Sequence, residues 1–214
     1  MSIENLRTEV RRLCNLTVRY VSDSEAERYY LSINSPANTM NNNEVNVLDS
    51  ISKDEKIMAE AHELGHIYVR ENGLVSIEPH GNEPYDYLML ELNNALSHKF
   101  VIDLLAQEFS ISSETHLNLR AASIRTVEKD IEELQDEIEI LHGIGLKLYD
   151  MITTIPHLRS EVERLASLNC DVYAAYSAAS TYLETVSPNT PREDQEEAIR
   201  SFLLHLGYER QVDF

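Results

Sequence analysis

The sequence is poor in cysteine, glycine and proline, and each shortage narrows the range of structures that it can form. Cys14 and Cys170 are too few for a disulfide framework, so we expect two free thiols and a reducing, cytoplasmic compartment. Six glycines and six prolines among 214 residues are about half the usual share. Neither type occurs between Tyr85 and His142, and that gap favours long helices.

Basic side chains are also scarce, because 18 lysines and arginines stand against 37 aspartates and glutamates, a net charge of −19. Such a field repels phosphate backbones and anionic lipids, so we expect neither direct nucleic-acid binding nor membrane association. No run approaches the roughly 20 apolar residues that a bilayer span needs. The first twelve residues also lack the apolar stretch of a signal peptide. These features predict a soluble cytoplasmic protein.

The hydrophobic content of 43% is enough for one or two globular units. In the first half, helical spacing of apolar residues predicts a short helix over residues 3–13. Alternating β-forming residues then predict a small mixed sheet, with strands at 16–21, 28–33 and 44–48 and a polar loop at 34–43.

Two longer helices follow the predicted sheet. Ser52 and Glu55 form a capping-box pattern that predicts a helix to about Asn72, where Gly73 can end it. A second helix is expected from about Tyr85 to Glu108. Residues 109–120 have the cadence of a helix-turn-helix, but their acidic surroundings favour a plain connector between helices.

The second half is expected to be entirely helical. Apolar residues step by three and four from Ile124 to Ile155, as in a coiled coil, and again from Leu158 to Leu183. Pro156 lies between the two runs, so we predict an antiparallel helical hairpin. The fold class is therefore α+β and mainly helical. The predicted parts are an N-terminal domain at 1–115 that contains the small sheet, the hairpin at 116–187, and a C-terminal helix and tail at 188–214.

One motif has a specific chemical meaning, the H-E-x-x-H pattern formed by His62, Glu63 and His66. Helical residues four apart project from the same face, so the two imidazoles can bind one Zn²⁺. Glu63 lies about 100° round the helix from His62, where it can act as the general base for the attacking water. Gly65 keeps the helix surface low, so that another segment can pack closely.

A catalytic zinc site usually takes a third protein ligand and leaves one position open. The position six residues after His66 is Asn72, which excludes the metzincin pattern. The downstream candidates are His80, Glu83, Asp86, Glu91 and His98. We favour Glu91, because a carboxylate beside the apolar residues 87–90 needs a partner. His98 could instead orient the substrate or Glu91. The donors available for an oxyanion are Tyr68, Tyr85, Tyr87 and His98.

Three stretches, taken in order, resemble the ImmA/IrrE family of zinc metallopeptidases, which has a DUF955-type domain. They are Ala61–His66, Glu91–Ala95, and Leu105–Ser112 followed by Arg120. The stretch Glu91–Ala95 is similar to the family's E-x-x-A-N helix, with Asn94 and Ala95 in exchanged order. The resemblance covers residues 1 to about 122, and the helical second half has no counterpart in the family.

The resemblance implies a gluzincin-like zinc site in which His62, His66 and Glu91 bind the metal and Glu63 is the catalytic acid and base. It implies a peptidase that cuts a regulatory protein, a transcriptional repressor or an antitoxin, at one site. Family members are commonly encoded on mobile elements or act in stress responses. Asn94, Tyr85, Tyr87 and His98 are candidates for contacts to the substrate, the transition state or the metal ligands.

The helical half leaves its own role open. Seven acidic residues and one lysine between Glu128 and Glu139 are typical of a solvated helix face, or could attract a basic partner such as a DNA-binding repressor. The hairpin is equally compatible with docking on the peptidase half and with pairing across a homodimer. The alternative function is a non-catalytic regulatory protein that keeps the zincin scaffold and acts through its helical half. A weaker alternative is a coiled-coil protein with an accidental H-E-x-x-H.

Overall fold

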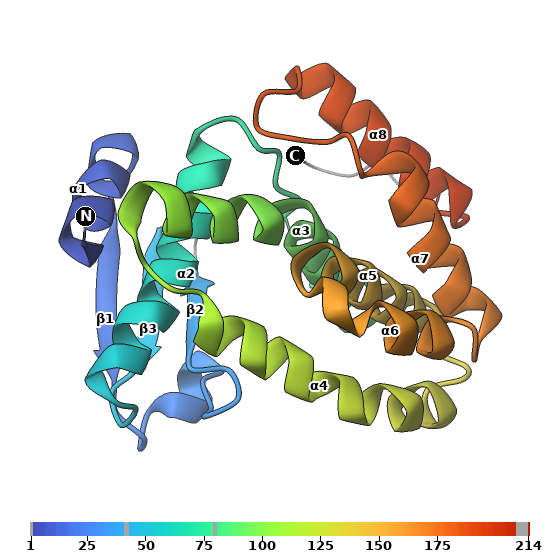
Figure 1. Cartoon of the computed structure of the whole chain (residues 1–214), viewed down its shortest axis with the longest axis horizontal. Helices are drawn as coiled ribbons and strands as arrows, with labels where there is room; N and C mark the ends of the chain where they lie inside the picture. The colour runs from blue at the N-terminus through green and yellow to red at the C-terminus, as the bar shows by residue number, and fades with distance from the viewer. Residues whose placement is uncertain (1, 41–42, 79–80, 209–213) are drawn as a thin grey trace. The chain divides into compact units, whose positions relative to one another are not determined.

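The structure is a computed structural model that describes residues 2–40, 43–78, 81–208 and 214. The chain is mainly helical and carries one small mixed sheet (Figure 1), which confirms the predicted α+β class. Contacts group it into two compact units. Unit 1 contains Met1–Asn72 and Phe100–Leu119, and unit 2 contains Gly73–Lys99 and Arg120–Phe214. The predicted division at 115 and 187 remains a prediction.

Within the described residues, no helix combines the length and hydropathy that crossing a bilayer requires. Two helices, α3 (Glu83–Leu104) and α4 (Glu114–Glu133), each contribute residues to both units.

The sheet of unit 1 has the strand order β1-β3-β2. Strand β1 (Thr17–Val21) runs parallel to β3 (Glu44–Leu48), whereas β2 (Ala37–Met40) runs antiparallel to β3. Val45 and Val47 of the central strand are fully buried. The predicted strands at 16–21 and 44–48 are confirmed, and the sheet is mixed as expected.

The predicted strand at 28–33 is wrong. A 3-10 helix, η1 (Ala26–Tyr29), occupies its start, and Tyr30 then adopts a left-handed conformation with φ 55°. Leu31 is buried in a small cluster with residues of β1 and β3, so an apolar side chain reaches the core from a turn. The strand prediction failed because tyrosine favours half-buried surfaces in general and does not by itself impose an extended backbone.

The third strand, β2, instead forms inside the predicted loop at 34–43. Its polar side chains are not typical of a strand, but two of them have specific acceptors. Asn38 Nδ2 donates to the carbonyl oxygen of Tyr29 at 2.6 Å, and Thr39 Oγ1 donates to Glu63 Oε2 at 2.7 Å.

Helix α2 (Lys53–Glu71) confirms the capping-box prediction. Glu55 N donates to Ser52 Oγ at 3.3 Å, and Ser52 N donates to Glu55 Oε2 at 2.9 Å. The helix packs on α1 (Ile3–Leu13) and on β3, and it buries Leu64 and Ile67 completely. Packing on two sides fixes the orientation of the helix that carries the H-E-x-x-H motif.

A buried ion pair ties α1 to the same helix, two residues before His62. Arg7 contacts both carboxylate oxygens of Glu60, through Nε at 2.5 Å and Nη2 at 2.6 Å. Tyr20 OH donates to Glu60 Oε2 at 2.6 Å. The hydrogen bond to Glu60 raises the pKa of Arg7, so the guanidinium stays charged. The Glu60 side chain is 1% exposed and that of Arg7 is 19% exposed.

Replacing Arg7 with Met is expected to destabilise the fold by about 3 kcal/mol, because it leaves the Glu60 carboxylate buried without its counter-ion. This loss of stability is at the low end of the range for breaking a buried ion pair, because the Arg7 side chain is still partly exposed to solvent. Arg12→Met is the matched control, because its pair with Glu9 is exposed on the same helix and is worth at most about 1 kcal/mol. Urea unfolding of both variants measures the difference, and equal losses would contradict the expectation.

Unit 2 is built around α5 (Ile138–Thr154), whose residues 141–146 and 148–152 are all buried. It packs against α6 (Arg159–Ala166) and α7 (Cys170–Tyr182), and α8 (Arg192–His205) packs on α7. The short 3-10 helix η3 (Pro156–Leu158) makes the turn after α5. The turn predicted at Pro156 is therefore present, with helices paired across it.

The two continuous helices predicted for this half are each interrupted. Helix α4 ends at Glu133, and Glu137 N donates to Leu134 O in the turn before α5. A continuous helix would place Glu132 beside Asp136 and Glu133 beside Glu137, and like charges four residues apart destabilise a helix. The break relieves both repulsions.

The second interruption falls between α6 and α7. Asn169 falls within the apolar repeat from Leu158 to Leu183, but its side chain caps α7 by accepting hydrogen bonds from the backbone of Asp171 and Val172. Gly145 then lets α5 approach α7 closely. A Cβ atom at this position would overlap the carbonyl oxygen of Val172 and lie 2.8 Å from Ala175 Cβ.

Candidate metal centre

Helix α2 brings the rings of His62 and His66 together on one face. Their Nε2 atoms lie 3.0 Å apart, and the ring planes are inclined at 87°. Two nitrogens that bind one tetrahedral zinc at the usual bond length are separated by about 3.3 Å. The observed separation is close to that value, so the pair can share one metal ion after a small movement.

Glu63 lies between the two histidines in sequence and is half-buried. Thr39 Oγ1 on β2 donates a hydrogen bond of 2.7 Å to Glu63 Oε2, which links the carboxylate to the sheet. This contact joins α2 to the edge strand and restricts the rotamers of the Glu63 side chain.

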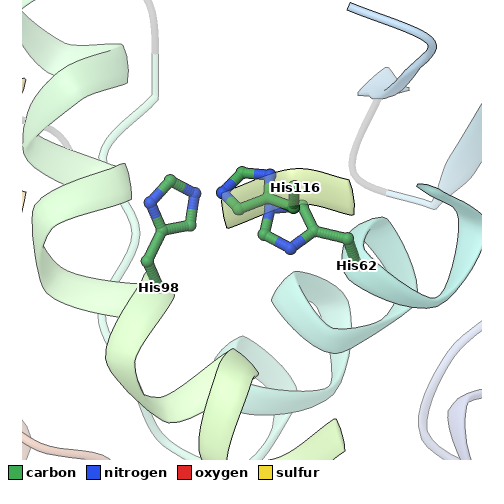
Figure 2. Close-up of side chains that lie close together, drawn as sticks. All are labelled: His62, His98 and His116. Carbon is green, nitrogen blue, oxygen red and sulfur yellow. The ribbon is translucent and has the colours of Figure 1, made fainter. Parts of the chain in front are cut away.

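Two further histidines lie beside His62. Ring nitrogens of His62, His98 and His116 are all within 4.8 Å of one another, and Figure 2 draws the three side chains close together on three helices. The rings of His62 and His116 are stacked, with centroids 3.6 Å apart and planes inclined at 21°. These three histidines lie close enough to bind a metal ion.

Gly65 explains how α3 approaches α2 at this point. A Cβ atom on Gly65 would lie 2.6 Å from Val101 Cγ1, so only glycine allows this contact without displacement. His98 precedes Val101 by three residues on the same helix, that is, by about one turn. The sequence suggested that the missing side chain of Gly65 lets another segment pack closely. That segment is α3, the helix that carries His98.

His116 is the functional candidate that the sequence analysis missed. It lies in the first turn of α4, three residues after Ser113, and it is partly buried. The sequence contained one usable signal, a histidine three residues after Ser113, a residue type that can cap the start of a helix. That signal says nothing about the distance to His62, which lies 54 residues earlier and is brought close only by the fold.

The predicted third ligand, Glu91, lies in a buried polar network of unit 2. Its Oε2 atom is 3.4 Å from Nη1 and Nη2 of Arg120 and accepts a 3.4 Å hydrogen bond from Asn94 Nδ2. Arg120 also forms an ion pair with Asp150. Burial lowers the pKa of Arg120, but the carboxylates of Asp150 and Glu91 outweigh it, and the net pKa is raised. The role of Glu91 as a metal ligand remains a prediction.

The three tyrosines that the sequence offered as oxyanion donors, Tyr68, Tyr85 and Tyr87, each pack against other side chains or lie in the interior. Tyr85 is buried and its ring lies 5.8 Å from that of Tyr208. Burial raises the pKa of Tyr87, which packs where a Cβ on Gly143 would lie. Tyr68 makes an edge contact with Phe109. Their catalytic roles remain predictions, and the candidate ligand His80 lies outside the described residues.

Comparison with known proteins identifies no relative: no family model matches the chain, and neither curated proteins nor solved structures give a match.

Proposed function

We propose that this protein is a zinc-dependent endopeptidase. The observation that carries the proposal is the 3.0 Å separation between the Nε2 atoms of His62 and His66, with Glu63 between them on the same helix. Imidazole nitrogens in this arrangement suit Zn²⁺ better than the hard, oxygen-preferring cations. An acidic residue beside such a pair is the arrangement that zinc metallopeptidases of the H-E-x-x-H type use to hydrolyse peptides.

The residues have distinct roles in the proposed reaction. When bound, zinc would polarise the peptide carbonyl and make a water molecule more acidic. His62 and His66 would hold the metal. Glu63 accepts the proton of the attacking water and then delivers it to the departing amine, so that one carboxylate acts first as base and then as acid. Thr39 orients Glu63 through its hydrogen bond.

We further propose an intracellular regulatory protein as the substrate, a repressor or an antitoxin, on the resemblance to the ImmA/IrrE family. The net charge of −19 supports a basic protein substrate over nucleic acid. A DNA-binding repressor fits this description, because the surface that contacts phosphate is positively charged.

A second candidate function is favoured by the stacking of His116 on His62. If His116 bound the same ion as His62 and His66, one more protein ligand would complete a tetrahedral site with no open position. Such a zinc site stabilises structure and performs no hydrolysis. The chain would then act as a regulatory protein that uses the zincin scaffold for binding.

X-ray absorption at the zinc edge, combined with a cleavage assay, separates the two functions. The purified holoprotein is incubated with a protein mixture, and new N termini are labelled and counted before and after metal removal. For the peptidase we expect at least one oxygen ligand beside the nitrogens of His62 and His66, with new N termini that disappear when the metal is removed. Four nitrogen ligands and no metal-dependent N termini would overturn the peptidase proposal.

A further inference from the structure

Unit 2 contains a cavity of about 330 Å³ that is partly open to solvent. This volume is at the small end of the range for small-molecule sites, about 300–1,000 Å³. The wall is mainly apolar and comes from α3, from α4 and α5, and from the turn that joins α4 to α5 (Figure 1). Its apolar and aromatic residues are Tyr87, Val127, Leu134, Ile140 and Ile144.

Close packing sets the shape of this wall. The ring of Tyr87 lies against α5 where that helix has no side chain, at Gly143. A Cβ atom on Gly143 would lie 2.6 Å from Tyr87 Cε1 and 2.7 Å from Tyr87 Cδ1, so a larger residue would displace the ring. Val127 and Ile144 are almost completely buried. The apolar surface of the cavity is therefore held in place by its neighbours, as in a preformed ligand site.

Two charged side chains, Lys147 on α5 and Asp130 on α4, line the same cavity and are partly buried. Within the described part of the chain, neither of them forms an ion pair, with the other or with a third residue. Asp130 Oδ2 accepts a hydrogen bond of 3.0 Å from Thr126 Oγ1. The cavity thus combines an apolar wall with one cation and one anion that are not paired with each other.

The amine of Lys147 has lost much of its hydration. Burial lowers its pKa, the carboxylate of Glu91 raises it, Arg120 lowers it and Asp130 raises it, and the net pKa is lowered. Glu91 already serves as a counter-ion of Arg120. A carboxylate group of a ligand, placed against Lys147, would replace the lost hydration and favour the charged amine.

The two charges narrow the class of ligand. A purely apolar molecule would cover both charges without pairing either, which is costly. An aliphatic carboxylate would pair with Lys147 but add a second anion beside Asp130, and the net charge of −19 repels anions at long range. An aliphatic amine would pair with Asp130 but add a second cation beside Lys147. A small molecule that carries both groups and an apolar side chain satisfies every part of the wall.

We propose that this cavity binds a free apolar α-amino acid. Its carboxylate pairs with Lys147, its ammonium group pairs with Asp130, and its side chain lies against the apolar wall. The inference goes beyond the proposed peptidase and does not depend on it, because all the lining residues belong to unit 2 and the H-E-x-x-H motif belongs to unit 1.

Calorimetric titration of the full chain with leucine and three analogues tests the proposal. Leucine should bind with a stoichiometry of about one, the number expected for a single site. 4-Methylpentanoate is leucine without the amine, 3-methylbutylamine is leucine without the carboxylate, and glycine lacks the apolar side chain. Each analogue should bind at least about tenfold more weakly, because each lacks one of the three groups that the wall pairs with.

Two variants assign the charges to the groups of the ligand. Lys147→Met should weaken leucine binding by about 10- to 100-fold, the effect of losing one charge-assisted hydrogen bond, and should no longer favour leucine over 3-methylbutylamine. Asp130→Asn should no longer favour leucine over 4-methylpentanoate. The matched controls, Lys129→Met and Asp136→Asn, make the same changes at exposed positions nearby and should bind leucine like the wild type.

The outcomes separate this cavity from the proposed zinc site. Leucine should bind equally well to His62→Phe, and a loss of binding there would place the amino acid at the metal and overturn the proposal. Equal binding of leucine and 4-methylpentanoate by the wild type would show a site for aliphatic acids instead. The proposal also fails if leucine, isoleucine, valine, methionine and phenylalanine all fail to bind at about 10 mM. Should Lys147→Met not fold, the analogue series on the wild type still decides.

Discussion

Glu63→Gln is expected to lower the cleavage rate by about 10²- to 10⁴-fold, the contribution of a positioned general base, while the protein still binds zinc. Glutamine has the same size and can still accept the hydrogen bond from Thr39 through its amide oxygen. It cannot take up a proton from water at neutral pH. The variant therefore removes the proton transfer and keeps the shape of the site.

The measurement counts new N termini after incubation with a protein mixture, at equal zinc content. Glu71→Gln is the matched control, because it makes the same charge change at an exposed position of the same helix. We expect this control to cleave like the wild type. A Glu63→Gln protein that cleaves at the wild-type rate would rule out Glu63 as the base, and with it the proposed mechanism.

The fold could be predicted from the sequence wherever the determinants are local. The capping box at Ser52 and Glu55 defines the start of α2, and β-branched residues define β1 and β3. The breaks near Leu134 and Asn169 were missed, since the apolar repeat continues across both. There, charge repulsion and a capping side chain outweigh the repeat.

The candidate site also has one part that the sequence predicts and one part that depends on tertiary packing. The His62 and His66 pair follows from helical spacing alone, and the structure brings the two rings together. His116 and the partner of His98 could not be predicted, because the contact with Asp150 spans 52 residues and depends on how α5 packs against α3. The chemistry of each side chain is evident from its residue type, whereas the choice of partner comes from tertiary packing.

His62→Phe is expected to reduce bound zinc from about one equivalent to less than about a tenth, because each ligand is essential to a three-ligand site. His62 is the most informative position of the cluster. It belongs both to the pair with His66 and to the group with His98 and His116. Its removal breaks the site whichever residue is the third ligand, and phenylalanine keeps an aromatic ring to stack on His116.

The same variant should lose the stabilisation that zinc gives to the folded state. At a free zinc concentration 100-fold above the dissociation constant, the wild type gains about 2.7 kcal/mol, which appears as a higher melting temperature. The variant should melt at the same temperature with and without zinc. His157→Phe is the control, because His157 is exposed and lies in η3, outside the cluster. Full zinc binding by His62→Phe would contradict the metal site, because the proposed site needs the imidazoles of both His62 and His66.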